Sequence, residues 1–280
     1  MSEETNKKKQ SRMQRVITGT VLAAGLIVVL ALGKWVTALA IVAALCLAVY
    51  EEFGAFKAGG YRPVMWPSYA ALAVSVPLML MHSAVSVAPV MMVFSIAILF
   101  CVMRREKPEL LDALVSATPL ITLVLPGMCA IGLLDSEPRS LQLYLLLMMF
   151  AVPILGDTFA YVVGSNVGGP KLCPLISPNK TISGAIGGLL GSVLGAVVVG
   201  RLFHAFVPAV TFPPMWAELL VGLVGGAAAQ MGDLFASMIK RHCKIKDFGH
   251  LFPGHGGMLD RLDSIIFTAI IIYCFRAFLL

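Results

Sequence analysis

The sequence predicts an all-α, polytopic integral membrane protein with about nine transmembrane helices and a cytoplasmic N-terminus. Hydrophobic residues make up 59% of its 280 residues, charged residues only 13%, and the mean hydropathy is +0.90. Soluble globular chains carry about 25% charged residues. This chain therefore has too little polar surface to enclose a soluble core of its size, and long apolar helices are the physical alternative.

Nine apolar runs along the chain are the candidates for these helices. Several are short for a full crossing, and only Gly33 and Lys34 separate the first two, which requires a tight reversal. A basic segment, residues 1–15, precedes a membrane domain over residues 16–280, in which polar cytoplasmic loops are expected at 164–183 and 241–263. The runs cover residues 16–33, 35–50, 67–82, 87–103, 114–134, 141–163, 184–207, 216–240 and 264–280.

The distribution of basic residues predicts which side of the membrane each loop faces. With a cytoplasmic N-terminus, 17 of the 21 Lys and Arg residues lie on the cytoplasmic side, as the positive-inside rule requires. The net charge of +6 does not indicate nucleic acid binding, because the charges lie in short segments between apolar runs. Cleavage of the first run as a secretion signal is disfavoured, since Lys34 and Trp35 interrupt the approach to a weak cleavage-like sequence at residues 38–40.

The six cysteines lie mostly inside apolar runs and include no C-x-x-C pair. This pattern predicts buried free thiols in a reducing setting rather than a disulfide framework.

Glycines recur at every fourth position of the run 184–207, at Gly187, Gly191 and Gly195. Small residues at this spacing allow two helices to approach closely. The next run has a similar smooth face. Packing within the chain is the main interpretation, and a homodimer seam is the alternative.

The densest polar stretch lies near the C-terminal end of the chain. Asp233 is about two turns inside the basic end of its helix at Lys240, and an ionised carboxylate within a membrane costs about 3 kcal/mol unless it is paired or hydrated. We therefore expect Asp233 to line a wet cavity or to bind a cation. Ser237 shares its helix face, and Asp260 and Asp263 share another.

Carboxylates interleaved with Lys and Arg predict a site for metal ions and phosphates. Mg²⁺ prefers oxygen ligands and is commonly held by one or two carboxylates plus substrate phosphates. Cationic side chains then neutralise the remaining phosphate oxygens, and the pair Gly256-Gly257 permits close backbone approach to a bulky anion. This combination is typical of phosphoryl or nucleotidyl transfer.

Each part of the stretch also has an ordinary structural interpretation. Lys240 and Arg241 alone are compatible with membrane anchors, and Asp260 and Arg261 with a structural ion pair. His255 alone is compatible with a loop histidine bonded to backbone. A zinc site is disfavoured because the spacing of its candidate ligands, His242, Cys243, His250 and His255, matches no standard finger.

Together, these residues form a long motif. It reads Ser237-x-x-Lys240-Arg241, four residues, Lys246-Asp247-x-Gly249, then Pro253-x-His255-Gly256-Gly257-x-x-Asp260-Arg261-x-Asp263. The motif covers 27 residues and resembles the signature of phosphatidate cytidylyltransferases. A second polar loop agrees with that resemblance through Asp157, Ala160-Tyr161, Gly164, Lys171-Leu172, Pro174 and Ile176-Ser177-Pro178-x-Lys180-Thr181. Ser183 departs from it, because an acidic or amide residue is expected there.

The resemblance implies transfer of the cytidylyl group of CTP to phosphatidate, giving CDP-diacylglycerol and pyrophosphate for phospholipid biosynthesis. It implies a multi-pass protein of the inner (cytoplasmic) membrane whose active site faces the cytoplasm, and Mg²⁺ held by Asp233 and Asp260, with room for a second cation. The implied catalytic residues are Asp233, Lys240, Arg241, Lys246, Asp247, His255, Asp260, Arg261 and Asp263. The implied substrate-binding residues are Asp157, Lys171, Ser177, Lys180, Thr181, Ser237, Gly256 and Gly257.

Other functions remain as alternatives. A cytidylyltransferase acting on a different lipid phosphate fits the same residues. An ion-coupled transporter with ion sites at Asp157 and Asp233 predicts inverted repeats and charges near span centres, but the charges here crowd at one membrane face. The D-G-x-x-A-R motif of CDP-alcohol phosphotransferases and the Walker A loop of ATPases are both absent from the sequence.

Overall fold

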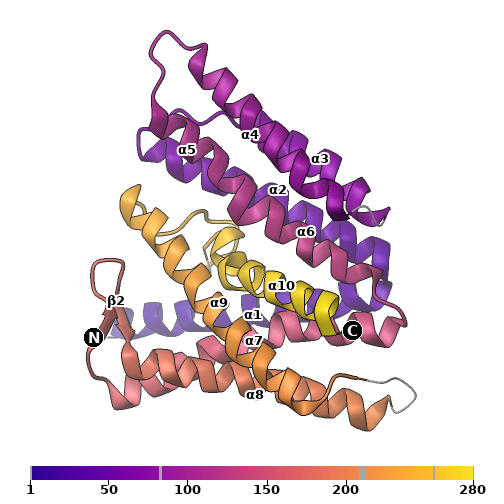
Figure 1. Cartoon of the computed structure of the whole chain (residues 1–280). Helices are drawn as coiled ribbons and strands as arrows, with labels where there is room; N and C mark the ends of the chain where they lie inside the picture. Colours follow the sequence, from indigo (N-terminus) through magenta and orange to yellow (C-terminus); the bar gives the residue numbers. More distant parts are fainter. Residues whose placement is uncertain (1, 82–83, 208–211, 255, 280) are drawn as a thin grey trace.

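The computed structural model describes residues 2–81, 84–207, 212–254 and 256–279, and their side chains from residue 17 to 278. Each predicted apolar run falls on a helix, so the helical class is confirmed (Figure 1). The tight reversal is also confirmed, since Gly33 lies between the first two helices at φ 104°. The helices are α1 (Ser2–Leu32), α2 (Lys34–Ala58), α3 (Trp66–Leu80), η1 (Ala84–Ser86), α4 (Val87–Met103), α5 (Leu110–Pro119), η2 (Leu120–Val124), α6 (Leu125–Gly132), η3 (Leu133–Asp135), α7 (Arg139–Val167), α8 (Ile182–Phe206), α9 (Met215–His242) and α10 (Leu259–Leu279).

The description all-α needs one correction. Strands β1 (Lys171–Cys173) and β2 (Ser177–Thr181) form an antiparallel hairpin between α7 and α8, with Lys171 opposite Thr181. Strands this short carry almost no alternating pattern, so periodicity could not reveal them. The hairpin matters because it places the polar residues of this loop against the helices.

Six helical segments are long and apolar enough to cross a membrane. Among the described residues these are Lys34–Ala58, Ala84–Met103, Leu110–Asp135, Arg139–Val167, Ile182–Phe206 and Met215–His242. The apolar part of α1 and all of α3 are shorter, at Ile17–Leu32 and Trp66–Leu80. The structure therefore supports a helical membrane protein with six candidate spans, fewer than the nine expected.

Several helices extend beyond the apolar runs that predicted them. Helix α2 continues to Ala58 and includes Glu51 and Glu52, both of which are buried. Helix α7 continues to Val167, four residues past its predicted end. The two glutamates of α2 find partners inside the protein, whereas Ser165 and Asn166 at the end of α7 donate to the carbonyl oxygen of Val162 in their own helix. The predicted loop 164–183 is shorter accordingly.

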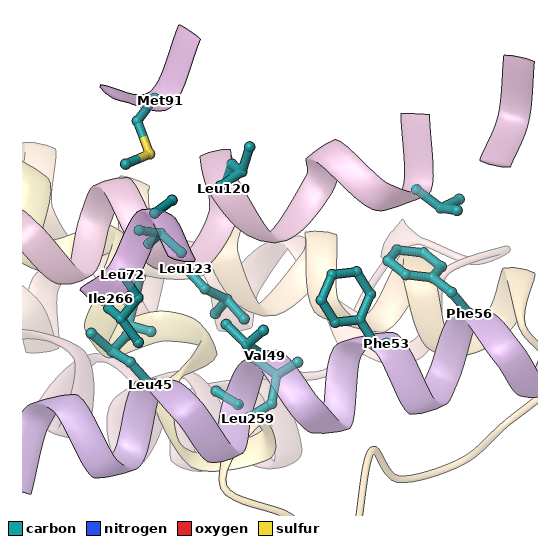
Figure 2. Close-up of a cluster of buried hydrophobic side chains, with 14 of the residues drawn as sticks. Leu45, Val49, Phe53, Phe56, Leu72, Met91, Leu120, Leu123, Leu259 and Ile266 are labelled. Atoms are coloured by element: carbon teal, nitrogen blue, oxygen red, sulfur yellow. The ribbon is translucent and has the colours of Figure 1, made fainter. Parts of the chain in front are cut away.

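Two apolar clusters form the interior, and α10 joins them. One cluster gathers α2 to α6 with the end of α9 and the early residues of α10, and the other gathers α1, α7, α8 and the earlier part of α9 with the later residues of α10. Figure 2 shows Leu259 and Ile266 of α10 lying with Val49 of α2 in the first cluster. Ala269 and Ile272 of α10 belong to the second. Helix α10 is thereby fixed between the two halves of the protein.

Glycines bring α7, α8 and α9 into close contact. A Cβ added at Gly187 would lie 2.6 Å from Val163, and one at Gly191 would lie 2.6 Å from the carbonyl oxygen of Leu155 on α7. On the opposite side, Gly222 of α9 packs on the α8 backbone. The glycine stripe of α8 is thus used within the chain, as its main interpretation predicted.

Candidate active site

A cavity of about 540 Å³ opens between α7, the hairpin, the start of α8 and the middle of α9. Its lining includes polar residues of strand β2 and two carboxylates that the sequence analysis named, Asp157 on α7 and Asp233 on α9. The lining residues are Asp157, Ala160, Tyr161, Gly164, Ser165, Leu172, Asn179, Lys180, Thr181, Gly184, Ala185, Gln230 and Asp233. Several residues of the second polar loop therefore meet Asp233 at one cavity.

Asp233 is paired with the hairpin. Its Oδ2 lies 2.5 Å from Nζ of Lys180, and each side chain is 29% exposed. An ion pair that remains partly exposed at a cavity wall can exchange its partner for a ligand more readily than a fully buried one. Ser237 lies one turn further along α9 and is half-buried. The expectation that Asp233 lines a cavity is confirmed.

Two more of the predicted carboxylates approach Asp233. Asp157 projects from α7 into the same cavity, and Asp263 lies in the second turn of α10, where its Oδ1 accepts the N–H of Ser264 at 2.8 Å. The charges of Asp157, Asp233 and Asp263 are close enough to repel one another. Three acidic side chains from three helices thus converge, and this is the kind of surplus negative charge that attracts a cation. The cationic side chains that offset the repulsion are Lys180, Lys240 and Arg261.

Asp260 is held by three donors. Its Oδ1 accepts Nζ of Lys240 at 2.8 Å, and its Oδ2 accepts the backbone N–H groups of Phe248 and Gly257 at 2.9 and 3.0 Å. The side chains of Lys240 and Asp260 are 15% and 6% exposed. A carboxylate offers about four lone-pair positions, so Asp260 retains one, on Oδ1, for a further partner.

Glu51, which the sequence motif does not include, organises this region from α2. Its two oxygens accept the backbone N–H groups of Met258 and Leu259, at 3.0 and 2.8 Å, at the N-terminus of α10. These N–H groups have no partner within the helix, and a negative charge there is favoured by the helix dipole. Asp260 on the other side and Glu51 on this one therefore fix the start of α10. A pair of acidic residues directly after an apolar run was the available signal.

The glycine pair before α10 makes room for these carboxylates. A Cβ at Gly256 would lie 2.7 Å from Oδ2 of Asp260, and one at Gly257 would overlap the carboxylate of Glu51. Gly256 also has a positive φ of 80°, which favours glycine. The anions that approach this backbone closely are thus the protein's own side chains.

The hairpin is tied to the helices on both sides. Thr181 caps α8 by accepting the N–H of Gly184 at 3.1 Å, and Ser183 donates to the carbonyl oxygen of Gly168. Arg241 at the end of α9 donates from Nε to the carbonyl oxygen of Ile176 at 3.3 Å. Ser183, the one departure from the expected motif, therefore joins the end of α7 to the start of α8.

The remaining predicted residues lie outside the cavity wall. Lys171, Lys246 and Asp247 are exposed, and Ser177 is half-buried in β2. His255 lies outside the described residues. His242 bonds the hydroxyl of Tyr61 at 2.6 Å. Over the described ranges no cluster of three or more His, Cys, Asp or Glu residues has the arrangement of a metal site. All six cysteines are free, but only Cys243 is buried, and Cys274 is exposed, so the expected burial holds only in part.

Comparison with known proteins is in line with this geometry. The sequence profile described as "Cytidylyltransferase family" matches residues 13–279. Three proteins named phosphatidate cytidylyltransferase are similar to part of the chain. The one from Brucella abortus is 42% identical over 132 residues, which are 47% of this chain and 46% of the relative. The one from Rickettsia conorii is 38% identical over 136 residues (49% and 59%), and that from Staphylococcus saprophyticus is 39% identical over 132 residues (47% and 48%).

These aligned stretches span about half the length of the curated relatives. The family profile, in contrast, extends from α1 to the end of α10 and so includes every element that lines the cavity. The chain belongs to the cytidylyltransferase family.

Proposed function

We propose that this protein transfers the cytidylyl group of CTP to phosphatidate, giving CDP-diacylglycerol and pyrophosphate. The observation that carries the proposal is the meeting of Asp157, Asp233 and Lys180 at one cavity, with Asp263 within electrostatic reach of both carboxylates, in a chain of this family. The relatives named above bear the name of this activity.

The reaction requires neutralisation of negative charge on the phosphates more than it requires proton transfer. A phosphate oxygen of phosphatidate attacks the α-phosphorus of CTP, a new P–O bond forms, and the bond to pyrophosphate breaks. A phosphate monoester has its second pKa near 6 and is largely deprotonated at neutral pH, so no general base is required. The barrier is the repulsion between two polyanions, together with charge that builds up on the leaving group.

Cationic side chains around the cavity are suited to lower that barrier. Lys180 lies at the cavity wall, and Arg261 and Lys240 lie within electrostatic reach of its carboxylates. We assign Lys180 and Arg261 to the phosphates, with Arg241, Lys246, Lys171, Ser177 and Thr181 as further candidates from the motif. Loss of one group that stabilises developing charge lowers the rate about a hundredfold.

Magnesium is part of the proposal, with Asp233 and Asp260 as its ligands. Asp233 fits because its carboxylate is accessible at the cavity, and Asp260 fits through the one lone-pair position that its three donors leave open. Bound Mg²⁺ would supply positive charge for the phosphate oxygens. Asp157 and Asp263 are further candidates, and together they leave room for a second cation.

We also propose nine spans and a cytoplasmic active site in the inner membrane. Helices α1, α3 and α10 would supply the three spans beyond the six candidates. Helix α10 contacts α2, α6, α7 and α9, and such a central position is compatible with a span that carries charge at its ends. The excess of Lys and Arg on the side of the hairpin supports the orientation. A homodimer would have to use a face other than the glycine stripe, which α7 covers.

Purified protein in detergent tests the proposal. CTP and phosphatidate are supplied with and without Mg²⁺, and pyrophosphate and lipid product are measured. Metal-dependent CDP-diacylglycerol is expected, and Asp233→Asn should reduce it about a hundredfold or more. Glu106→Gln, an exposed carboxylate in the α4–α5 connection, is the matched control and should retain activity.

Two outcomes would contradict the assignment. Full activity of Asp233→Asn would remove Asp233 from the site. No lipid product from folded wild-type protein would favour another lipid phosphate, which the same assay detects when the acceptor lipid is changed.

A further inference from the structure

A second cavity, of about 480 Å³, lies between α1, α2, α6, α7 and α10. Among the described residues that line it, Thr37 is the one with a polar side chain. Its hydroxyl contacts the carbonyl oxygens of Val29 and Gly33 at 3.1 and 3.0 Å. The hydroxyl group therefore already has acceptors for its proton and needs none from a bound molecule. Such walls are suited to an apolar chain and offer nothing to a nucleotide or an ion.

The mouth of this cavity lies beside the candidate active site. Met258, Leu262 and Ile265 line it along one face of α10. Arg261 follows Met258 by three positions and precedes Ile265 by four, so it lies on the same helix face. Arg261 is exposed, forms no ion pair with any carboxylate in the described parts of the chain, and lies within electrostatic reach of Asp157. The guanidinium group of Arg261 thus lies between the polar cavity and the apolar one without a carboxylate partner among the described residues.

The depth of the apolar cavity matches one leaflet of a bilayer. From Met258, directly before α10, to Ala269 within it, the lining rises about 16 Å at about 1.5 Å per residue. Half of a hydrocarbon layer about 30 Å thick is about 15 Å. Helix α1 closes the other side from Val21 to Leu30, and Thr18 above them contacts the carbonyl oxygen of Pro253 at 3.3 Å. With Arg261 at the headgroup level, as in the orientation proposed above, the cavity would end near the middle of the membrane.

We propose that this cavity is an acyl-chain chamber, which holds one fatty-acyl tail of the lipid phosphate substrate while Arg261 binds its phosphate. The inference rests on the proposed function and adds to it where the lipid lies. A lipid tail gains little by leaving one apolar surrounding for another. The chamber accordingly serves to position the phosphate for attack rather than to increase affinity.

Gly25 allows a direct test. It lines the chamber from α1, and a Cβ added to it would meet nothing within 4 Å. Gly25→Leu would therefore place a bulky side chain at the chamber with no clash at its Cβ, and leucine favours a helix more than glycine does. Gly54 on α2 is a matched control, because it is also an exposed helical glycine with open space at its Cβ and lines neither cavity.

The measurement compares dioleoyl phosphatidate with dihexanoyl phosphatidate, whose tails end near the mouth of the chamber. Gly25→Leu should lower kcat/KM for the dioleoyl lipid by about tenfold or more, since a misplacement of about 1 Å can cost about a hundredfold. It should leave the dihexanoyl lipid within about twofold, and Gly54→Leu should leave both within that range. An equal loss on both lipids, or no loss on either, would overturn the chamber.

A second readout does not depend on turnover. Phosphatidate with a photoreactive group at the end of one tail should crosslink to α1, α6 or α10 at the chamber floor, near Leu30, Ala130 and Ala269. Excess dioleoyl phosphatidate should suppress the crosslink, and phosphatidylcholine should not. Equal suppression by both lipids would show that bulk lipid fills the space and would overturn the inference. If wild-type protein made no product from either phosphatidate, the proposed function would be contradicted. If it made product but Gly25→Leu affected both lipids alike, only the acyl-chain chamber would be contradicted.

Discussion

Replacing Glu51 by alanine removes the acceptor for two backbone N–H groups at the start of α10. Hydrogen bonds to charged groups contribute about 1.5–3 kcal/mol each, so the loss is about 3 kcal/mol or more. For a chain of this size, 1 kcal/mol corresponds to about 2–4 °C in Tm. We therefore expect the Tm of Glu51→Ala to be about 6–12 °C below that of wild type. The Tm of Glu51→Gln, which keeps one acceptor oxygen, should lie between those of wild type and Glu51→Ala.

Thermal unfolding in detergent measures this effect, and CTP-dependent turnover well below the Tm shows whether the site is disturbed. Turnover should fall as well, because Glu51 and Asp260 hold the same end of α10. Glu52→Gln is the control, because this neighbour is also buried but bonds only the hydroxyl of Thr122, at 3.2 Å, among the described residues. Glutamine can still accept that bond. If Glu51→Ala matched Glu52→Gln in both Tm and turnover, the reasoning would be refuted.

Two further predictions concern the site and its scaffold. Lys240→Met or Asp260→Leu alone should each lower stability by about 3–5 kcal/mol, because either leaves an unpaired buried charge. The double variant should recover part of that loss; simple additivity in a double-mutant cycle of unfolding free energies would argue against the pair. Gly191→Val should lower the free energy of unfolding by about 1–3 kcal/mol or more through overpacking against α7, and so lower the Tm. Gly54→Ala serves as its control, and an unchanged Tm for Gly191→Val would show that the helices can separate freely.

The helices could be predicted because the length and hydropathy of a run are local properties. A segment that must satisfy its backbone without water becomes a helix wherever it is apolar for long enough. Their ends could not be predicted in the same way. Helix α2 continues through Glu51 and Glu52 because these side chains find partners on α10 and η2, 207 and 70 residues away along the chain.

The candidate site also has features that the sequence predicts and features that only the packing of the helices decides. Asp233 had to face a cavity or a cation, because a carboxylate on an apolar helix has few other options. That its partner is Lys180, from a hairpin with no sequence signal, depends on how α7, α8 and α9 pack. The same holds for Asp260, which was expected to hold metal and is bound by Lys240 and two backbone N–H groups.

By itself, the sequence determined a helical membrane chain, the polar residues proposed to carry its chemistry, and the motif that resembles its family. These depend on composition and spacing within single segments. Only the tertiary structure decided which carboxylates converge, which glycines contact α7, and where the apolar chamber lies between α1 and α10. The reason is physical: an apolar helix is hydrophobic on every side, so its sequence does not specify its rotation, and its neighbours are chosen by packing across the whole protein.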